Sequence, residues 1–586
     1  MQLRHAAAVS FGSIQLALET VSIDQAYAIA EMGTSGLRLS QEQYNRPLFF
    51  EQFVQGIADY FVEELAALGE LADASRTVIL GGDPRMGNQD RIKLAAEILV
   101  ANGLRVIIAQ DGLASTPAMS HAIRQYEALG GLIFTASHNP FTDAGIKVNK
   151  RDGSGALTDT TRAIANKQNA LTEFKKINYR EAVDAGVIVD NFAALASYAD
   201  LLDGIFDFAS MRQKVSEMEV SLGRKLSVAL DAMHGAAGPF AYEVFINRLG
   251  LDAKLLHGRP DPRLGTALGD EAHAFHPEPD FSFLPELIKL NATGAYDLVA
   301  AWDADVDRRL DGGSGFWVES ADEAAIFAKY GPMIGLQKLF NQADGQPGTI
   351  YFCRSTVTAH AIDLMGEQLQ AIYGALGYQV KIVETPTGFR WIAELGNNGV
   401  EESNGHGNPY IREKDGIYAS VFLLKIMLET GKTPRQLMEE IWKASGRVYF
   451  TRGEVSGTDV SQKTQLTDIL NNAARQVGKN FGTLTLEAAE SWDYVHPVSG
   501  KVADKGAAYV LRFSDGNVIK ARYSGTGTGA WLLRVYASKE DQRYDIPKSD
   551  ITQPMKDAFD AFLRANGFAG KSEKYTDAEQ PDPYKT

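Results

Sequence analysis

Residues 135–140 combine a serine, a histidine, an asparagine and a proline directly after the apolar run Gly130–Phe134. This pattern predicts a buried strand that places Ser137 and His138 on a tight polar turn. A serine hydroxyl is a weak nucleophile, and a fixed turn lets its neighbours orient and activate it. From these residues alone, an Asx-type turn that only ends the strand is the alternative.

A second motif has aspartates at alternate positions after the apolar run 298–302: Asp303, Asp305 and Asp307. Carboxylates that converge at the end of a buried strand suit Mg²⁺, and such strand ends face the ligand crevice of open α/β sheets. An EF-hand would need Gly and Glu where this chain has Arg308 and Ser314. A solvated acidic turn, the other alternative, is hard to reconcile with a buried strand.

Residues 401–406 and 412–416 form a third polar segment. Its carboxylate and hydroxyl groups can accept hydrogen bonds from a sugar, and Lys414 can bind a phosphate. A charge run of this kind is also typical of a solvated helix start.

The fourth segment, residues 522–529, is rich in glycine, serine and threonine and lies between two predicted strands. Its backbone N–H groups can approach an anion, and Arg522 or Arg534 can bind a phosphate through two N–H groups. It is neither a Walker A loop, since no Gly-Lys-Ser/Thr ending follows, nor a Rossmann fingerprint, since Ala530 replaces the third glycine. A flexible hairpin loop is the alternative.

Composition limits the class of protein. With 586 residues, 45% hydrophobic and 23% charged, the chain is globular and long enough for about four domains of ~150 residues. A net charge of −16 argues against nucleic-acid or anionic-membrane binding. Cys353 is the single cysteine, which excludes an intrachain disulfide, and the N-terminus shows no convincing signal-peptide cleavage site. We therefore expect a cytoplasmic protein.

Apolar strands alternate with amphipathic helices in three successive rounds, which predicts three α/β domains. The strands expected are residues 77–80, 105–108, 226–230, 298–302, 349–352 and 380–383. After about residue 446, a hairpin around Asp515 and Gly516 and a strand over 531–536 favour an antiparallel sheet with flanking helices. The polar tail from Lys571 is expected to be disordered or loosely attached.

These motifs, in this order, resemble the α-D-phosphohexomutase superfamily, most closely its phosphoglucomutase branch, from Gly33 to about Tyr536. The phrases that carry the resemblance are residues 33–38, 81–85, 115–117, 231–235, 384–388, 411–416 and 524–527. The resemblance implies four domains around a central cleft: α/β domains over 1–203 with the phosphoserine loop, 204–318 with the metal loop and 319–445 with the sugar-binding loop, and a C-terminal α+β, TATA-binding-protein-like phosphate-binding domain over 446–586.

The resemblance also implies a phosphotransferase that interconverts glucose 1-phosphate and glucose 6-phosphate, with a phosphoserine at Ser137 and glucose 1,6-bisphosphate as intermediate and activator. The implied catalytic residues are Ser137, His138, Lys147 and Arg38, with Lys147 a general base of lowered pKa. Mg²⁺ would bind Asp303, Asp305, Asp307 and an oxygen of phosphorylated Ser137. The implied substrate contacts are Arg308, Thr387, Gly388, Arg390, Glu401, Ser403 and Lys414, and the implied phosphate contacts are Arg522, Ser524, Gly525, Thr526, Thr528 and Arg534.

The chain departs from the family pattern in places. Ala304 and Val306 stand where glycines are common, which requires a negative φ at both. Val400 also replaces a usual glycine, and Arg390 replaces a lysine and cannot be deprotonated, so it is expected to bind phosphate or hydroxyl groups.

The alternative functions are phosphomannomutase, another phosphohexomutase such as one for N-acetylglucosamine phosphates, and a non-catalytic phosphosugar-binding protein. Retention of Ser137, Lys147 and the three aspartates argues against the last. We expect a small phosphosugar ligand, no nucleic-acid or membrane partner, and a monomer, with a dimer as the alternative.

Overall fold

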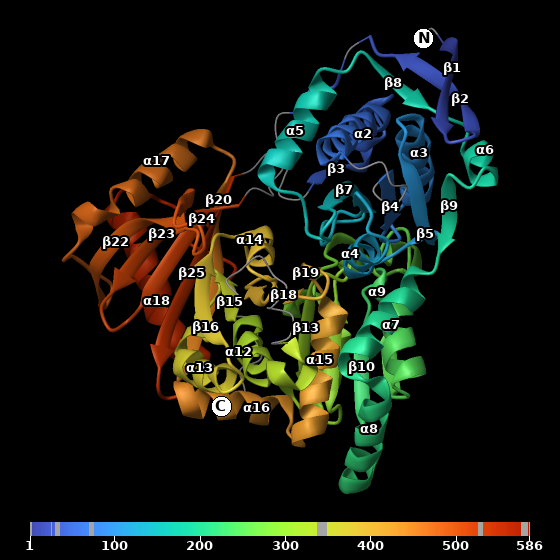
Figure 1. The fold of residues 1–586 in the computed structure, drawn as a ribbon. Coiled ribbons are helices and arrows are strands. Elements are labelled where there is room, and N and C mark those ends of the chain that lie inside the picture. The colour runs from blue at the N-terminus through green and yellow to red at the C-terminus, as the bar shows by residue number, and fades with distance from the viewer. Residues whose placement is uncertain are drawn as a thin grey trace. The chain divides into compact units, whose positions relative to one another are not determined.

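The computed structural model describes residues 3–24, 26–29, 36–69, 76–336, 348–524, 531–575 and 584. The chain forms two compact units, and Figure 1 traces the chain through both. Unit 1 comprises Met1–Leu290, Ala295–Asp311 and Gly405–Gly431, and unit 2 comprises Asn291–Gly294, Gly312–Asn404 and Lys432–Thr586.

The first sheet of unit 1 has the order β3-β7-β6-β4-β5-β9. Its strands are β3 (Gly36–Ser40), β4 (Thr77–Gly82), β5 (Arg105–Leu113), β6 (Gly130–Phe134), β7 (Asp143–Lys150) and β9 (Ile188–Phe192). Strand β4 pairs in parallel with β5 and β6, whereas β7 is antiparallel to β3 and β6. The helices of this domain are α1 (Gln41–Tyr44), α2 (Phe49–Leu68), α3 (Asn88–Ala101), α4 (Thr116–Gln125), α5 (Thr158–Asn169), α6 (Tyr179–Asp184) and α7 (Ala194–Phe206).

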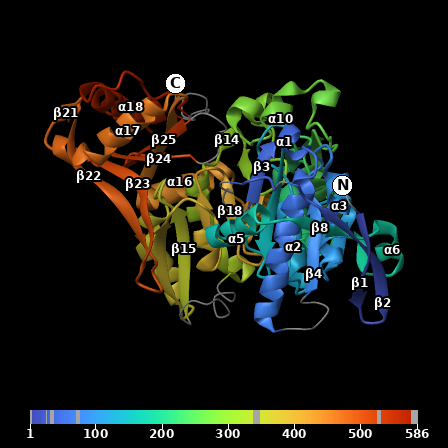
Figure 2. The same cartoon turned by 90° about the horizontal axis from the view of Figure 1, so that it is seen from above.

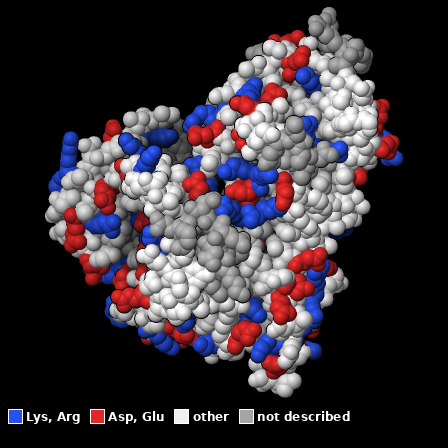
Figure 3. All heavy atoms as spheres, viewed as in Figure 1, with Lys and Arg blue, Asp and Glu red and all other residues white. Residues whose placement is uncertain are grey.

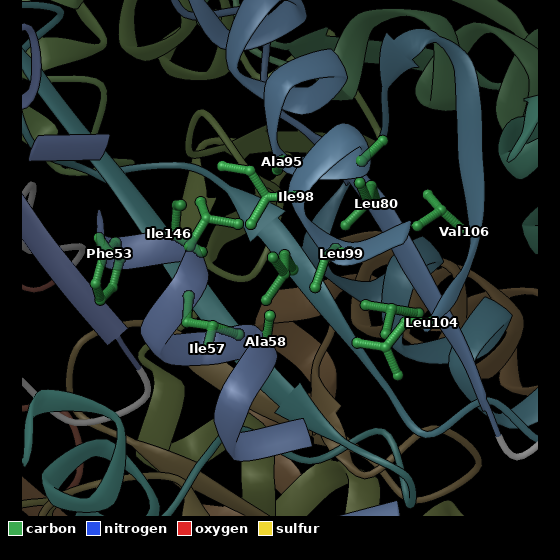
Figure 4. Packing of buried hydrophobic residues seen from close by; sticks show 14 of the residues in the cluster. Phe53, Ile57, Ala58, Leu80, Ala95, Ile98, Leu99, Leu104, Val106 and Ile146 are labelled. Atoms are coloured by element: carbon green, nitrogen blue, oxygen red, sulfur yellow. The ribbon is translucent and has the colours of Figure 1, made fainter. Parts of the chain in front are cut away.

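The central strands β4 and β6 are buried along their whole length, which explains why they are almost entirely apolar. Leu80 and Ile146 face a core formed with α2 and α3, where Phe53, Ile57 and Ile98 pack around them (Figure 4). Residues at the intervening positions, such as Ile79 and Ile133, face a second core with α4. The polar ends of β4 and β6 are therefore held rigidly.

A hairpin of β1 (Leu3–Phe11) and β2 (Ile14–Ser22) extends this domain through β8 (Glu173–Lys176). Figures 1 and 2 show it at the periphery of the domain, beside the N-terminus. The sequence patterns above do not predict it, although Ile14, Leu16 and Leu18 alternate with polar or small residues as in a half-buried strand.

The second sheet of unit 1 is built on β10 (Ser227–Asp231), which is parallel to β11 (Asp252–Leu256) and β12 (Leu298–Trp302). Strand β13 (Arg309–Gly313) follows β12 in the sheet. The helices are α8 (Phe208–Leu222), α9 (Ala237–Ala241), a π-helix (Tyr242–Arg248), α10 (Glu271–Phe275) and α11 (Pro285–Ala292). Unit 1 also contains the hairpin β18 (Gly405–Asn408) and β19 (Glu413–Lys414), followed by the largely buried α15 (Gly416–Thr430).

Unit 2 contains a parallel sheet of β16 (Gln379–Thr385), β15 (Thr349–Ser355) and β17 (Gly399–Glu401). A short strand, β14 (Phe316–Trp317), pairs with the end of β13. The helices of this part are α12 (Ser320–Tyr330), α13 (Gly366–Gly374), α14 (Arg390–Glu394) and α16 (Pro434–Ser445). Short 3₁₀ helices in the two units span Thr266–Leu268, Phe281–Phe283, Gly331–Ile334, Asp363–Met365 and Ala473–Gln476.

The C-terminal sheet of unit 2 has the order β20-β25-β24-β23-β22-β21 and is antiparallel. Its strands are β20 (Arg447–Gly457), β21 (Asn480–Phe481), β22 (Leu484–Val495), β23 (Val502–Phe513), β24 (Val518–Tyr523) and β25 (Trp531–Asp541). Helices α17 (Val460–Asn471) and α18 (Lys548–Ala565) cover one face (Figure 2). Asp515 and Gly516 both have positive φ, as the predicted hairpin requires.

This architecture confirms the predicted fold class of three α/β domains and a C-terminal α+β domain. The start of the C-terminal tail differs from expectation, because Ser572 Oγ donates to Asp560 at 2.6 Å and Lys574 pairs with Glu454 at 2.6 Å. No helix of the described residues is long and apolar enough to cross a membrane. On the face shown in Figure 3, basic and acidic side chains are interspersed, so the acidic residues there do not form a single block.

Candidate active site

Ser137 lies on the turn after β6 and is buried. Its φ of +53° is in the left-handed region, which costs a non-glycine residue roughly 1–2 kcal/mol. The Ser137 N–H donates to Thr135 Oγ1 at 2.7 Å, and the Thr135 hydroxyl donates to Asp83 Oδ2 at 2.6 Å. These contacts hold the strained turn that presents the Ser137 hydroxyl.

Arg85, a buried residue just after β4, clamps the same turn. Its guanidinium pairs with Asp83 at 2.9 Å and donates to the carbonyls of Ser137, Asn139 and Pro140 at 2.5, 2.7 and 2.5 Å. The sequence motifs point to Asp83 and Arg85 only as part of the family resemblance. Their position after a strand parallel to β6 is the signal that places them here, because such strands end at one edge of the sheet.

The three aspartates after β12 converge as predicted: each of Asp303, Asp305 and Asp307 is buried and contributes an oxygen within 4.8 Å of the others. Among the described residues, no hydrogen-bond donor reaches the buried atoms Asp305 Oδ1 and Asp307 Oδ1. Ser137 Oγ lies 3.3 Å from Asp303 Oδ2. Orphaned carboxylate oxygens beside a hydroxyl are the donor set that Mg²⁺ prefers, so these residues fit a magnesium ion.

The pKa values of Asp303 and Asp307 shift in opposite directions. Burial, with Asp305 and Asp307, raises the pKa of Asp303 well above its ordinary value. Burial also acts to raise the pKa of Asp307, but Lys147, Lys414 and Arg308 outweigh it and lower that pKa well below its ordinary value. The cations therefore concentrate on one side of the cluster.

Lys147 lies on β7 and reaches into the cluster. Its ammonium group donates to Asp305 Oδ2 at 2.5 Å, to Asp307 Oδ2 at 2.6 Å and to Thr116 Oγ1 at 3.4 Å. Burial acts to lower the pKa of Lys147, but the two carboxylates outweigh it and the pKa is raised. The expected lowered pKa is therefore wrong, because the charges nearest the ammonium are negative.

His138, Arg308 and Arg38 lie near the serine turn. His138 Nδ1 lies 3.3 Å from the Ser137 hydroxyl, and burial, with Arg308, lowers the pKa of His138 well below its ordinary value. Arg308 pairs with Glu278 at 2.8 Å, an acid that the sequence motifs do not single out. Arg38 donates to Asn139 Oδ1 at 3.5 Å.

The backbone of the metal loop differs from expectation at Val306, whose φ is +70° rather than negative. The Val306 N–H donates to Asp303 O at 3.1 Å, and Val306 O accepts from the Gly416 N–H at 3.0 Å. A Cβ on Gly416 would lie 2.6 Å from Trp302 and 2.9 Å from Arg308 O. The loop therefore needs glycine at 416 and holds a β-branched residue in left-handed backbone at 306.

Lys414 belongs to the polar segment 401–416 and is predicted to contact a phosphate. It lies on β19 of unit 1, and its ammonium is 3.2 Å from Asp307 Oδ2. Glu401 and Ser403 belong to unit 2 instead. The polar segment 401–416 thus divides between the units, and its lysine joins the carboxylate cluster.

In unit 2, Glu401 ends β17 and its Oε1 accepts the Gly388 N–H at 2.8 Å. Gly388 has φ +119°, which favours glycine, in the turn after β16. This turn brings Thr387, Gly388 and Glu401 together. Thr387 Oγ1 and Glu402 Oε2 are buried and find no hydrogen-bond partner among the described residues.

Arg390 and Ser403 flank this region. Arg390 begins α14, with its guanidinium carbon 4.6 Å from the centre of the Trp391 ring. Ser403 is half-buried in the turn after β17.

The predicted phosphate-binding arginines lie on the C-terminal sheet. Arg522 on β24 and Arg534 on β25 are direct cross-strand partners, and Glu454 on β20 lies opposite Arg534. Directly opposed residues share a face of the sheet, and like charges there are destabilising. The helix-covered face is formed by alternate residues such as Leu533 and Val535, so the arginines project from the other face.

Tyr536 connects the sheet face that carries Arg522 and Arg534 (the arginine face) to the segment around Glu401 and Gly388 (the candidate sugar turn). It is two residues after Arg534, on the same face, and its hydroxyl donates to Glu402 Oε1 at 3.4 Å. Ser524 follows β24, whereas Gly525, Thr526 and Thr528 lie outside the described residues. Unit 2 thus places carboxylate and hydroxyl oxygens near a pair of arginines.

Sequence models of protein families match three parts of the chain. Residues 30–175 and 352–445 match the alpha/beta/alpha domains I and III of phosphoglucomutase/phosphomannomutase, and residues 447–581 match the phosphoglucomutase-1 C-terminal domain. Phosphoglucomutase 1 of Drosophila melanogaster is 31% identical over 571 residues, which cover 92% of this chain and 96% of the relative. The chain belongs to the phosphoglucomutase family.

Other relatives agree with this membership. Human phosphoglucomutase-1 is 30% identical over 557 residues, covering 89% of this chain and 92% of that protein. The open-form crystal structure of the Paramecium phosphoprotein pp63/parafusin, a phosphoglucomutase, has a TM-score of 0.77 and 27% identity, covering 95% of this chain and 99% of that one. Membership in the phosphoglucomutase family confirms the predicted enzyme class, an isomerase-class phosphotransferase, and favours phosphoglucomutase over the alternatives.

Proposed function

We propose that this protein interconverts glucose 1-phosphate and glucose 6-phosphate by passing a phosphoryl group through Ser137. The observation that carries the proposal is the Ser137 hydroxyl, which is held on a strained, clamped turn 3.3 Å from a cluster of three buried aspartates. A turn that only ended a strand would not require this network. Family membership supports glucose phosphates as the substrates.

The metal that we propose is Mg²⁺, held by Asp303, Asp305 and Asp307 with an oxygen of phosphorylated Ser137. When bound, it would neutralise negative charge on the transferring phosphoryl group. Arg38 and Arg308 contribute further positive charge at the same place, and the remaining task of the protein is to position the reacting atoms.

We propose that His138 orients the Ser137 hydroxyl, because its Nδ1 lies 3.3 Å from Oγ and its lowered pKa makes it a weak base. Lys147 has three acceptors for its three N–H groups: Asp305, Asp307 and Thr116. We therefore assign Lys147 a positioning role in place of the general base implied by the family.

Glucose 1,6-bisphosphate is the intermediate that we propose, and it must turn over so that each phosphate in turn faces Ser137. Glu401, Thr387, Ser403 and the Gly388 turn would bind the sugar hydroxyls in both orientations, with Arg390 beside them. The non-reacting phosphate would bind Arg522, Ser524 and Arg534, together with Gly525, Thr526 and Thr528. Lys414 and Arg308 would face the reacting phosphate, since both lie at the carboxylate cluster.

Replacing the nucleophile tests the proposal. Ser137→Ala should abolish turnover of glucose 1-phosphate in the presence of trace bisphosphate, and the variant should remain folded by circular dichroism. Ser197→Ala, which changes a serine on α7 that contacts Gln125, is the matched control and should keep wild-type activity. The intact mass of the wild type incubated with bisphosphate should rise by one phosphoryl group, about 80 Da, mapping to Ser137. Wild-type turnover by Ser137→Ala would refute the phosphoserine mechanism.

We further propose that the protein acts in the cytoplasm as a monomer on small phosphosugars. A single cysteine suits a reducing compartment, and the net charge of −16 opposes binding to polyanions. Light scattering of the purified chain measures the oligomeric state, and a dimer mass would refute the monomer.

A further inference from the structure

Unit 1 contains a second group of metal-ligating side chains, which is distinct from the carboxylate cluster. This histidine cluster consists of His234, His257, Asp270 and His273, each of which contributes one ligand atom within 4.8 Å of the others. We propose that it binds a structural zinc ion. The phosphoryl-transfer function proposed above does not use these residues.

The spacing of the cluster matches zinc coordination. His234 Nε2 lies 3.4 Å and His257 Nε2 lies 3.6 Å from Asp270 Oδ2. Ligand atoms at the corners of a tetrahedron with zinc bonds of about 2.1 Å are about 3.4 Å apart. The His273 Nδ1 to Asp270 Oδ2 distance, 2.5 Å, is a hydrogen bond that would lengthen as the ion enters.

The hydrogen bonds around the cluster direct imidazole lone pairs inward. His257 Nδ1 lies 2.9 Å from Asp231 Oδ1, and His234 Nδ1 lies 3.4 Å from Arg259 O. If these Nδ1 atoms carry the protons, both Nε2 atoms direct lone pairs at the Asp270 carboxylate. The Nε2 atom of His234 is buried and has no hydrogen-bond partner among the described residues. Converging acceptors favour a bound cation, and a carboxylate behind an imidazole is a common support for a zinc ligand.

Two of the histidines in this cluster have backbone in the unfavourable left-handed region. His234 follows β10 with φ +57°, and His257 follows β11 with φ +48°. Asp270 caps α10, and its side chain accepts the N–H of His273, so the helix start sets the spacing of these two ligands. Non-glycine residues in left-handed backbone are unfavourable, and they cluster at functional sites.

The donor set indicates the ion and its role. Imidazole suits zinc, whereas three imidazoles are poor ligands for Mg²⁺ and Ca²⁺. Four protein ligands fill a tetrahedral site, which is typical of structural rather than catalytic zinc. The side chains of His257 and Asp270 are 21% and 23% exposed, so an ion can enter from solvent.

A zinc ion here would brace the turn that carries Ser137. The segment between β11 and α11 contains α10, where Ala274 O accepts the Phe141 N–H at 2.8 Å and the rings of Phe141 and Phe275 meet edge to face. Phe141 lies four residues after Ser137. The zinc ion would tie this segment to the ends of β10 and β11 and so hold the serine turn from a second side.

Zinc titration of the full-length, metal-stripped protein in excess Mg²⁺ tests this proposal. We expect one zinc ion per chain by elemental analysis, a Tm that rises with zinc concentration, and a tetrahedral Co²⁺ absorption spectrum on cobalt substitution. His273→Gln and Asp270→Asn should each weaken zinc binding at least 10-fold. Asp231→Asn should weaken it about 10–100-fold through His257.

Two controls separate this site from others. His276→Gln changes an exposed histidine on the same segment, stacked on Phe283, and should bind zinc as the wild type does. Asp305→Asn should also retain zinc, because it alters only the carboxylate cluster. A wild-type chain that takes up no zinc in excess Mg²⁺ overturns the proposal, as does a folded His273→Gln or Asp270→Asn variant with undiminished affinity. Loss of zinc in Asp305→Asn likewise overturns it.

Discussion

Two threonines show how the proposed reaction site of unit 1 differs from the proposed sugar and phosphate region of unit 2. Thr116 accepts from Lys147 and donates to Asp305 at 2.5 Å, so its hydroxyl is used by the protein itself. The hydroxyl of Thr387 is equally buried, but no described residue bonds it. The hydroxyl of Thr116 is thus satisfied within the protein, whereas the hydroxyl of Thr387 is left for a ligand to complete.

The charges follow the same division. Lys147 and Lys414 pair with Asp307 inside unit 1, and Arg85 binds three carbonyls of the serine turn. In unit 2, Arg522 and Arg534 face each other across two strands, an arrangement that a bound phosphate would stabilise. Preorganised groups favour transition-state stabilisation, and incompletely paired groups favour recognition of the substrate.

The largest effect should follow from breaking the unit 1 network. Asp305→Asn removes a candidate magnesium ligand and leaves Lys147 with one carboxylate. We therefore expect kcat to fall about 1,000-fold and the Mg²⁺ concentration for half-maximal activity to rise. Activity against Mg²⁺ concentration measures both. Asp297→Asn is the control, since Asp297 precedes β12 and pairs with Arg224 at 2.6 Å away from the cluster, and it should stay near wild type. Full activity of Asp305→Asn in metal-free buffer would contradict the site.

Low pH should weaken the ion pairs of Glu384, which connect the two sheets of unit 2. Glu384 pairs with Arg354 at 3.0 Å and Lys520 at 2.6 Å. Burial acts to raise the pKa of Glu384, but the two cations lower it to about 2, from 4.5 for an ordinary glutamate. A lowered folded-state pKa stabilises the fold above pH 4.5, by about 3 kcal/mol, and this contribution disappears as the pH falls toward 2.

Glu384→Gln should therefore lower the free energy of unfolding by about 3 kcal/mol at pH 7, and by roughly 1–1.5 kcal/mol less at pH 3.5. Urea unfolding of both proteins at the two pH values measures this difference. The exposed Glu367→Gln serves as control and should track the wild type at both. A Glu384→Gln effect that is independent of pH would show that the carboxylate charge is not the cause.

Within unit 2, the sugar turn and the arginine face should have separable effects. Glu401→Gln should lower kcat/KM about 10-fold in both directions of the reaction, because one acceptor serves both orientations of the sugar. Arg534→Ala should raise KM about 10-fold for glucose and mannose phosphates alike, because the proposed contact of Arg534 is with the phosphate and not with the sugar. Unaltered kinetics of Glu401→Gln for both sugars would remove the local support for glucose binding.

Replacing the two matched threonines should give the smallest effects, and these effects test the comparison between the units most directly. Thr116→Val should cost about 1–3 kcal/mol of stability, because Asp305 and Lys147 lose a buried partner. Thr387→Val should leave stability unchanged or slightly raised and lower kcat/KM only a few-fold. Thermal unfolding measures the stability of the two variants, and steady-state kinetics measures their kcat/KM. Equal destabilisation by both substitutions would contradict the contrast between the units.

Local patterns in the sequence predict much of this protein. The apolar runs before Ser137 and Asp303 identify strands that are buried on both faces, and the Asp515-Gly516 pair identifies the hairpin turn. The alternate spacing of the three aspartates predicts their convergence. These features depend on residues close together in the chain, where periodicity and turn chemistry act directly. The domain boundaries and the roles of individual site residues remain predictions.

Contacts between distant residues required the tertiary structure. Lys147 lies 158 residues from Asp305, and only their approach raises the lysine pKa instead of lowering it. Val306 has a positive φ, and its carbonyl accepts a hydrogen bond from the N–H of Gly416, far along the chain. The division of segment 401–416 and the histidine cluster, whose members span 40 residues, have the same origin. Local sequence specifies strands, helices and turns. The electrostatic environment of each side chain and the groups that it contacts depend on which strand ends the fold brings together.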